Sequence, residues 1–161
     1  MKKNFLFFIL FMFVIFSVKA EESVPVDVIA DSMKWDDENR IAFAIGNAEA
    51  TQGERKLQAD ELVVHLNKEK SNNEVIFIEA KGNVIFTNQG EIASGEKAKY
   101  DLIKNNIIIQ DNVKLMKNEN IMAGQHLEMD LSTGISNIKS EKKNERVRVR
   151  FSTNNEEIDN E

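Results

Sequence analysis

Residues 78–86 of the chain read IEAKGNVIF, and this short stretch decides the fold. Apolar side chains stand at every second position on both sides of a central Gly-Asn pair: Ile78, Ala80, Val84 and Phe86. Such alternation is typical of a β-strand with one buried face. Glycine in the middle of a strand indicates a bulge or a bend, since the backbone there can adopt conformations that a Cβ would obstruct. We therefore predict a long strand that bends at Gly82.

The same pattern occurs twice more, around Gly46-Asn47 and around Asp111-Asn112, where aspartate takes the place of glycine. A second strand pattern starts 13 residues after each pair and has one additional copy near the N-terminus. In it, a small residue and an acidic or amide residue precede alternating apolar positions. Its copies begin at Ala30-Asp31, Ala59-Asp60, Gly95-Glu96 and Gly124-Gln125. Repeats of this kind indicate a stack of similar units.

Turn-forming residues separate the predicted strands, for example in residues 51–54 and 87–91. No stretch has a convincing helical period of 3.6 residues. We predict an all-β meander of antiparallel strands, stacked unit upon unit around an apolar interior. A degenerate fourth unit ends the stack, and in it Arg146, Arg148 and Arg150 alternate with apolar residues.

The two ends of the chain differ in composition from the repeats. Residues 1–20 combine two early lysines, an apolar run from Phe5 to Val18 and small residues before Glu21, which predicts a cleaved secretory signal peptide. A retained membrane anchor is the alternative, although the run is short for a span. We expect one domain over residues 21–151 and a disordered acidic tail over residues 152–161.

The charge of the exported chain excludes one class of partner. Removing residues 1–20 takes three of the 21 Lys and Arg residues and no acid, so 18 basic and 27 acidic side chains leave a net charge of −9. Nucleic-acid binding requires cations that neutralise phosphates, so we expect no nucleic-acid partner. The chain also has no cysteine, and its fold must depend on core burial and strand pairing rather than disulfides.

Catalytic patterns are missing from the sequence. The chain has two histidines, His65 and His126, and both occupy repeat positions where other units have charged residues, so we expect them to be solvated. The acidic or amide residue that opens each unit recurs too regularly for a single catalytic site and suits a structural role. No nucleophile motif, phosphate loop or metal-ligand cluster is present. We expect no enzymatic activity and no cofactor.

Several of these segments resemble the OstA-like family of lipopolysaccharide-transport proteins. The resemblance rests on the order and spacing of residues 30–33 (ADSM), 46–48 (GNA), 51–53 (TQG) and 59–64 (ADELVV), and it covers about residues 26–131. It implies an open β-jellyroll whose V-shaped interior holds acyl chains. It also implies a periplasmic location, end-to-end association of copies, and inner-membrane and outer-membrane partners in lipopolysaccharide export.

The apolar face of the repeats is the candidate binding site. Strand parity predicts a continuous stripe, which the resemblance assigns to the lipid path: Val26, Val28, Trp35, Val64, Leu66, Val84, Phe86, Tyr100, Leu102, Val113, Leu115, Met129 and Leu131. A closed hydrophobic core would give the same alternation, and periodicity alone does not separate the two.

Three functional hypotheses follow. The leading one is a periplasmic bridge that carries lipopolysaccharide from the inner to the outer membrane and shields its acyl chains in the groove. The alternatives are a membrane-anchored inner-membrane partner of the same machine and a lipid-free structural β-repeat protein. For the bridge we expect self-association through terminal strands, near residues 26–29 and 147–151, because an open meander leaves two unpaired edges.

Overall fold

The computed structural model describes residues 24–69, 73–140 and 145–152. The predicted signal peptide and residues 153–161 of the predicted tail lie outside these ranges. The described chain forms one antiparallel sheet of ten strands. The strands are β1 (Asp27–Ile29), β2 (Ser32–Asp36), β3 (Ile41–Gln52), β4 (Arg55–Leu66), β5 (Val75–Asn88), β6 (Glu91–Asp101), β7 (Asn106–Lys117), β8 (Asn120–Asp130), β9 (Ile135–Lys139) and β10 (Arg148–Arg150). The all-β meander predicted from the repeats is confirmed.

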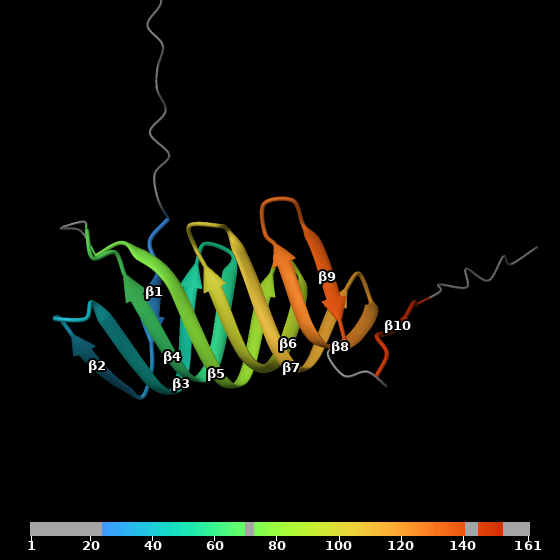
Figure 1. The fold of residues 1–161 in the computed structure, drawn as a ribbon, viewed down its shortest axis with the longest axis horizontal. Helices are drawn as coiled ribbons and strands as arrows, with labels where there is room; N and C mark the ends of the chain where they lie inside the picture. Colours follow the sequence, from blue (N-terminus) through green and yellow to red (C-terminus); the bar gives the residue numbers. More distant parts are fainter. Residues whose placement is uncertain (1–23, 70–72, 141–144, 153–161) are drawn as a thin grey trace, which may run out of the picture.

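Six long strands follow one another from β3 to β8, and each pairs with the next along the chain. Two short strands flank each end of this series: β1 and β2 both pair with β3, and β9 and β10 both pair with β8. Figure 1 shows the strands stacked along the long axis of the molecule, from the N-terminal to the C-terminal units. The two edges therefore consist of interrupted strands, as the degenerate first and last repeats imply.

Each predicted bend is a β-bulge. The register of β3, β5 and β7 with the following strand shifts at the Gly-Asn or Asp-Asn pair. Both residues of every pair have positive φ, including 78° for Gly82 and 47° for Asn83. Aspartate fills the first position in the third unit with φ of 64° at Asp111, because aspartate tolerates this left-handed region better than most residues. One extra residue per bulge bends each long strand.

A side-chain clamp holds each bulge. The Asn47 amide donates to the Asp31 carboxylate at 2.8 Å, and the Asn83 amide donates to Asp60 at 2.9 Å. The acidic residue that opens each unit therefore lies next to the bulge of the neighbouring strand. Its predicted structural role agrees with these hydrogen bonds.

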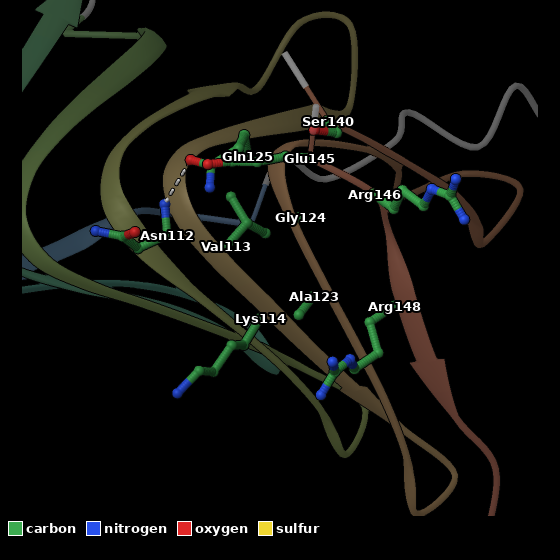
Figure 2. Close-up of a pocket in the computed structure, with 10 residues that line it drawn as sticks. All are labelled: Asn112, Val113, Lys114, Ala123, Gly124, Gln125, Ser140, Glu145, Arg146 and Arg148. Atoms are coloured by element: carbon green, nitrogen blue, oxygen red, sulfur yellow. Dashed lines mark hydrogen bonds between the residues drawn. The ribbon is translucent and has the colours of Figure 1, made fainter. Parts of the chain in front are cut away.

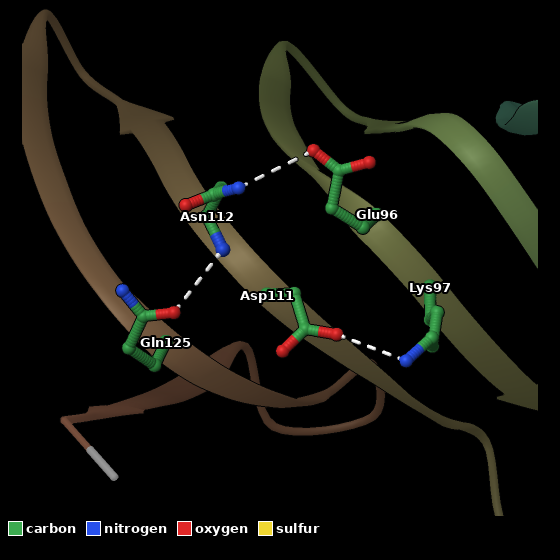
Figure 3. A network of polar contacts seen from close by, with 5 residues as sticks. All are labelled: Glu96, Lys97, Asp111, Asn112 and Gln125. Carbon is green, nitrogen blue, oxygen red and sulfur yellow. Dashed lines mark hydrogen bonds and ion pairs between the residues drawn. The ribbon is translucent and has the colours of Figure 1, made fainter. Parts of the chain in front are cut away.

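The third clamp uses different residues for the same purpose (Figure 3). The Asn112 side chain donates to Glu96 at 3.4 Å, and its backbone N–H donates to the side-chain oxygen of Gln125 at 3.3 Å. Lys97 adds an ion pair with Asp111 at 3.1 Å. The clamp thus joins β6, β7 and β8.

The line of bulges folds the sheet into two arms. We call arm A the strand halves that end at the turns 53–54, 89–90 and 118–119, and arm B the halves that end at the turns 37–40, 102–105 and 131–134. In Figure 1 the bends lie along the lower edge of the molecule and the hairpin turns lie above them. The apolar face of each arm points into the space between them, where the buried side chains form one cluster. Among the described residues, no helix is long and apolar enough to cross a membrane.

Gly82→Ala tests the bulge. A Cβ at this position would collide with the Asp60 carboxylate, whereas a Cβ at Gly90, which has a similar φ of 82°, would meet no atom within 4 Å. The left-handed φ alone makes Gly90→Ala cost about 1–2 kcal/mol. Gly82→Ala should lower the free energy of unfolding by about a further 1–3 kcal/mol through overpacking. Urea unfolding of both variants measures the difference, and equal losses would contradict the clamp.

Candidate functional site

The interior between the arms contains most of the predicted stripe. Eight of its residues are buried, and all of them except Leu66 belong to the core cluster: Val64, Leu66, Val84, Phe86, Tyr100, Val113, Leu115 and Met129. Four others are half-buried and pack against that cluster: Val26, Val28, Leu102 and Leu131. Trp35 is the exception, with 51% of its surface exposed. The structure thus brings the stripe together on one inner surface, and lipid contact by these residues stays a prediction.

The middle of the interior is closed by packed side chains. Phe86 is 1% exposed and Tyr100 is 3% exposed, and their ring centroids lie 5.8 Å apart. The two residues are not directly opposite each other in the β5–β6 hairpin. Phe86 pairs with Ala93 on arm A, and Tyr100 pairs with Ile78 on arm B. The rings meet because the fold at Gly82 brings the two arms face to face.

The interior opens at its N-terminal end. A pocket of about 380 Å³ lies there between strands β1 to β4 and the start of β5. Five stripe residues line it: Val26, Val28, Trp35, Val64 and Leu66. Trp35 donates its indole N–H to Asp37 at 3.3 Å, so the polar tip of the ring is satisfied while its apolar body borders the pocket. This pocket is the mouth of the interior.

A second pocket lies between the segment before β1, the start of β5 and the turn that follows β6. Its volume is about 430 Å³, and Val26, Gln52, Val75 and Leu102 are among its lining residues. Val26 and Val75 border both pockets, so the two spaces are neighbours.

Polar residues join the two rows of turns above the interior. The Tyr100 hydroxyl donates to the Gln52 side-chain oxygen at 2.6 Å, and the Arg55 guanidinium donates to the Tyr100 hydroxyl at 3.1 Å and to Asn105 at 2.6 Å. Gln52 and Arg55 belong to arm A, whereas Tyr100 and Asn105 belong to arm B. We call these four residues the rim cluster.

A second cross-arm contact lies further along the rim. Lys117 donates to the Gly134 carbonyl at 3.1 Å and pairs with Glu91 at 2.7 Å. Of the residues in these cross-arm contacts, the predicted stripe includes Tyr100 but not Gln52, Arg55, Asn105 or Lys117, because the stripe was assigned from apolar positions. The signal was present: Arg55 and Lys117 have the same parity as the buried residues Leu57 and Leu115.

Polar groups away from the rim include His65 and the carboxyls of two turns. No group of three metal-ligating side chains occurs within the described ranges. His65 is not simply solvated as expected, because it stacks on Phe77 at 4.0 Å and contacts Glu79 at 2.9 Å. Hydrogen bonds lower the pKa of two turn carboxyls: the Asn39 side chain acts on Asp36, and the Thr133 backbone acts on Asp130. Both carboxyls stabilise turns.

The family model described as LptA/(LptD N-terminal domain) LPS transport protein matches residues 27–135, which is more than half of the chain. The chain belongs to this family. The match spans strands β1 to β8 and contains every buried residue of the core cluster. A search of curated proteins found no match.

Solved structures support the same fold. One similar structure is that of LptH from Pseudomonas aeruginosa, described as the LptA-homologous periplasmic component of the lipopolysaccharide transport device. Its TM-score is 0.69 at 19% sequence identity, and the alignment covers 81% of this chain and 96% of that one. The open β-jellyroll implied by the sequence resemblance is thus confirmed, and the matching family is a transport family rather than an enzyme family.

Phe86→Ala tests whether the closed middle of the interior supports the fold. Removing this buried ring should lower the free energy of unfolding by about 3–5 kcal/mol, because the substitution leaves a cavity. Phe151→Ala is the matched control, since Phe151 is 72% exposed. That variant should change stability by about 0.5 kcal/mol or less. A similar small effect at Phe86 would mean that the arms do not pack on each other in solution.

Proposed function

We propose that the chain is a periplasmic bridge that carries lipopolysaccharide from the inner to the outer membrane and holds its acyl chains between arms A and B. One observation supports this best. The chain belongs to a lipopolysaccharide-transport family, and its interior is lined by apolar side chains and has a pocket at Trp35. The residues of the predicted stripe are the proposed lipid contacts. The predicted signal peptide agrees with the periplasmic location.

The physical need for such an interior is large. Each methylene exposed to water costs about 0.8 kcal/mol, so a chain of about twelve methylenes costs on the order of 10 kcal/mol. An apolar surface of suitable width offsets this cost without any chemical step. Energy for directional movement comes from a partner, since the sequence has no nucleotide-binding motif.

Lipid entry requires the arms to separate, and the hydrogen-bond pattern allows it. Backbone hydrogen bonds of the described residues run between neighbouring strands within one arm or at the bends. The arms contact each other through side-chain packing, the rim cluster and Lys117. Opening therefore replaces contacts such as Phe86 with Tyr100 by contacts with acyl chains, while the sheet ladder stays intact.

The two edges suit end-to-end association. Strand β1 at one end and β10 at the other are short and have one unpaired side each in the described chain. On the outer face of arm A, Arg148 (Figure 2) and Arg150 project from β10. At the other edge, Asp27 projects from β1, and Glu49, which pairs with Lys56, lies opposite Ile29 on β3. Strand addition would bring these opposite charges together. We propose that copies extend the apolar path in this way, and that other export components dock on the same edges.

Two alternatives keep the fold but change the role. A membrane-anchored inner-membrane partner would retain Met1, whereas the bridge would begin at Glu21, and mass spectrometry of the native protein distinguishes them. A lipid-free structural β-repeat protein would purify without lipopolysaccharide under conditions that preserve the bridge's cargo.

Photo-crosslinking tests the proposed lipid path. A crosslinking residue at Phe86, Tyr100 or Leu102 should give lipopolysaccharide adducts, because these positions face the interior. The same residue at Lys99 or Asp101 should give few adducts, since their side chains alternate to the other face. Adducts at Lys99 and Asp101 without adducts at the three interior positions would mean that the faces are assigned backwards.

Sedimentation velocity tests the proposed association. The wild-type chain without its signal peptide should form larger species as its concentration rises, and Arg148→Glu with Arg150→Glu should shift the distribution towards monomer. Arg146→Glu is a nearby control outside the β10 pairing. A wild-type protein that stays strictly monomeric at every concentration and binds no export component would contradict end-to-end assembly.

A further inference from the structure

Arg55 is an unusual residue for the rim of an apolar interior. It opens strand β4 and shares the inward parity of Leu57, which is buried. Its guanidinium lies directly over the interior, because one nitrogen contacts the hydroxyl of Tyr100, whose ring packs against Phe86 below. Only the Tyr100 side chain therefore separates the permanently charged guanidinium from Phe86 on the proposed acyl path.

The partners of Arg55 leave its charge uncompensated. Its hydrogen bonds go to the Tyr100 hydroxyl at 3.1 Å and the Asn105 side-chain oxygen at 2.6 Å, and both acceptors are neutral. Within residues 24–69, 73–140 and 145–152, no carboxylate forms an ion pair with it. Two nearby cations, in contrast, have carboxylate partners. Lys56 pairs with Glu49 at 3.0 Å, and Lys117 on the same rim pairs with Glu91 at 2.7 Å.

We propose that Arg55 binds a phosphate group borne by the lipid headgroup and makes the rim selective for phosphorylated amphiphiles. This inference rests on the proposed function and deepens it. An arginine presents five N–H donors in a planar fork that matches phosphate bidentately, and both bonds are charge-assisted. A phosphate attached beside acyl chains places its anion above an apolar region, which is the arrangement that Arg55 and the interior offer.

The other rim residues complete the subsite. The Gln52 and Asn105 amides each have a second N–H that can donate to the remaining phosphate oxygens. One N–H of Gln52 donates to the Val24 carbonyl at 3.3 Å, and one N–H of Asn105 donates to the Ser132 hydroxyl at 2.7 Å. When Arg55 exchanges Tyr100 and Asn105 for phosphate, it releases its own contacts between arm A and arm B. Headgroup recognition thus removes one set of the contacts that hold the arms together, while the Tyr100–Gln52 and Lys117–Gly134 contacts do not depend on it.

The test compares two lipids on three proteins. The full chain without its signal peptide, Arg55→Gln and Lys56→Gln are titrated with lipid A that retains its phosphates and with dephosphorylated lipid A. Lys56→Gln is the matched control, because it removes one charge from the same hairpin on the outer face. Wild type and Lys56→Gln should bind the phosphorylated lipid about 10-fold or more tightly than the dephosphorylated one. In Arg55→Gln this ratio should fall towards one.

Further measurements separate the possible failures. Thermal unfolding and binding of an apolar fluorescent probe should confirm that Arg55→Gln keeps its fold and its interior, and Arg55→Lys should restore only part of the preference. An unchanged ratio in folded Arg55→Gln would overturn the proposal, as would equal binding of both lipids by wild type. Inorganic phosphate that binds to Arg55 as strongly as the lipid does would point to a free anion and would also overturn it. If wild type bound neither lipid, the proposed function itself would fail.

Discussion

The hydrogen bond from a bulge asparagine to the carboxylate of the neighbouring strand is the interaction on which the rest of the structure depends. It fixes a pair of left-handed residues in the middle of a long strand and so sets a one-residue shift in register. Because side chains alternate, the shift determines which face of each half-strand points inward. Three such bulges in line fold one sheet into two arms whose apolar faces meet. A straight sheet of the same sequence would leave its apolar face exposed to water.

This construction separates the stability of the sheet from the closure of the interior. Strand ladders and bulge clamps hold each arm and the fold line, whereas side chains alone hold the arms together. In the lipid-free chain, Phe86, Tyr100 and the buried aliphatic residues around them satisfy one another. A lipid can replace these contacts with acyl chains at small net cost, because both environments are apolar. Under the proposed function, the residues that form the core of the empty protein would also line the lipid path of the loaded one.

The sequence predicted the repeating strands, the bends at Gly46 and Gly82 and the inward face, because each depends on local backbone preference or on alternation. It could not predict which inward residues touch across the interior. Parity places Phe86 and Tyr100 on one face, but their contact depends on the angle between the arms, which only the folded bulges determine. The sequence could not predict the rim cluster for a related reason. Arg55 and Asn105 are 50 residues apart, and they meet only because the bulges bring the two arms together. Whether lipid occupies the interior is not encoded in alternation, because a dry core and a lipid path need the same side chains.

Methyl NMR of the chain labelled at isoleucine δ1 positions tests the central claim most directly. Ile78, Ile107 and Ile109 are fully buried between the arms, and Ile85, Ile92 and Ile121 lie 40% exposed on the outer face. If lipid passes between the arms, added lipopolysaccharide should shift the three interior methyl signals and give cross-relaxation with acyl-chain protons, while the outer three stay nearly unchanged. Acyl contacts confined to the outer methyls, with the interior signals unmoved, would contradict the account.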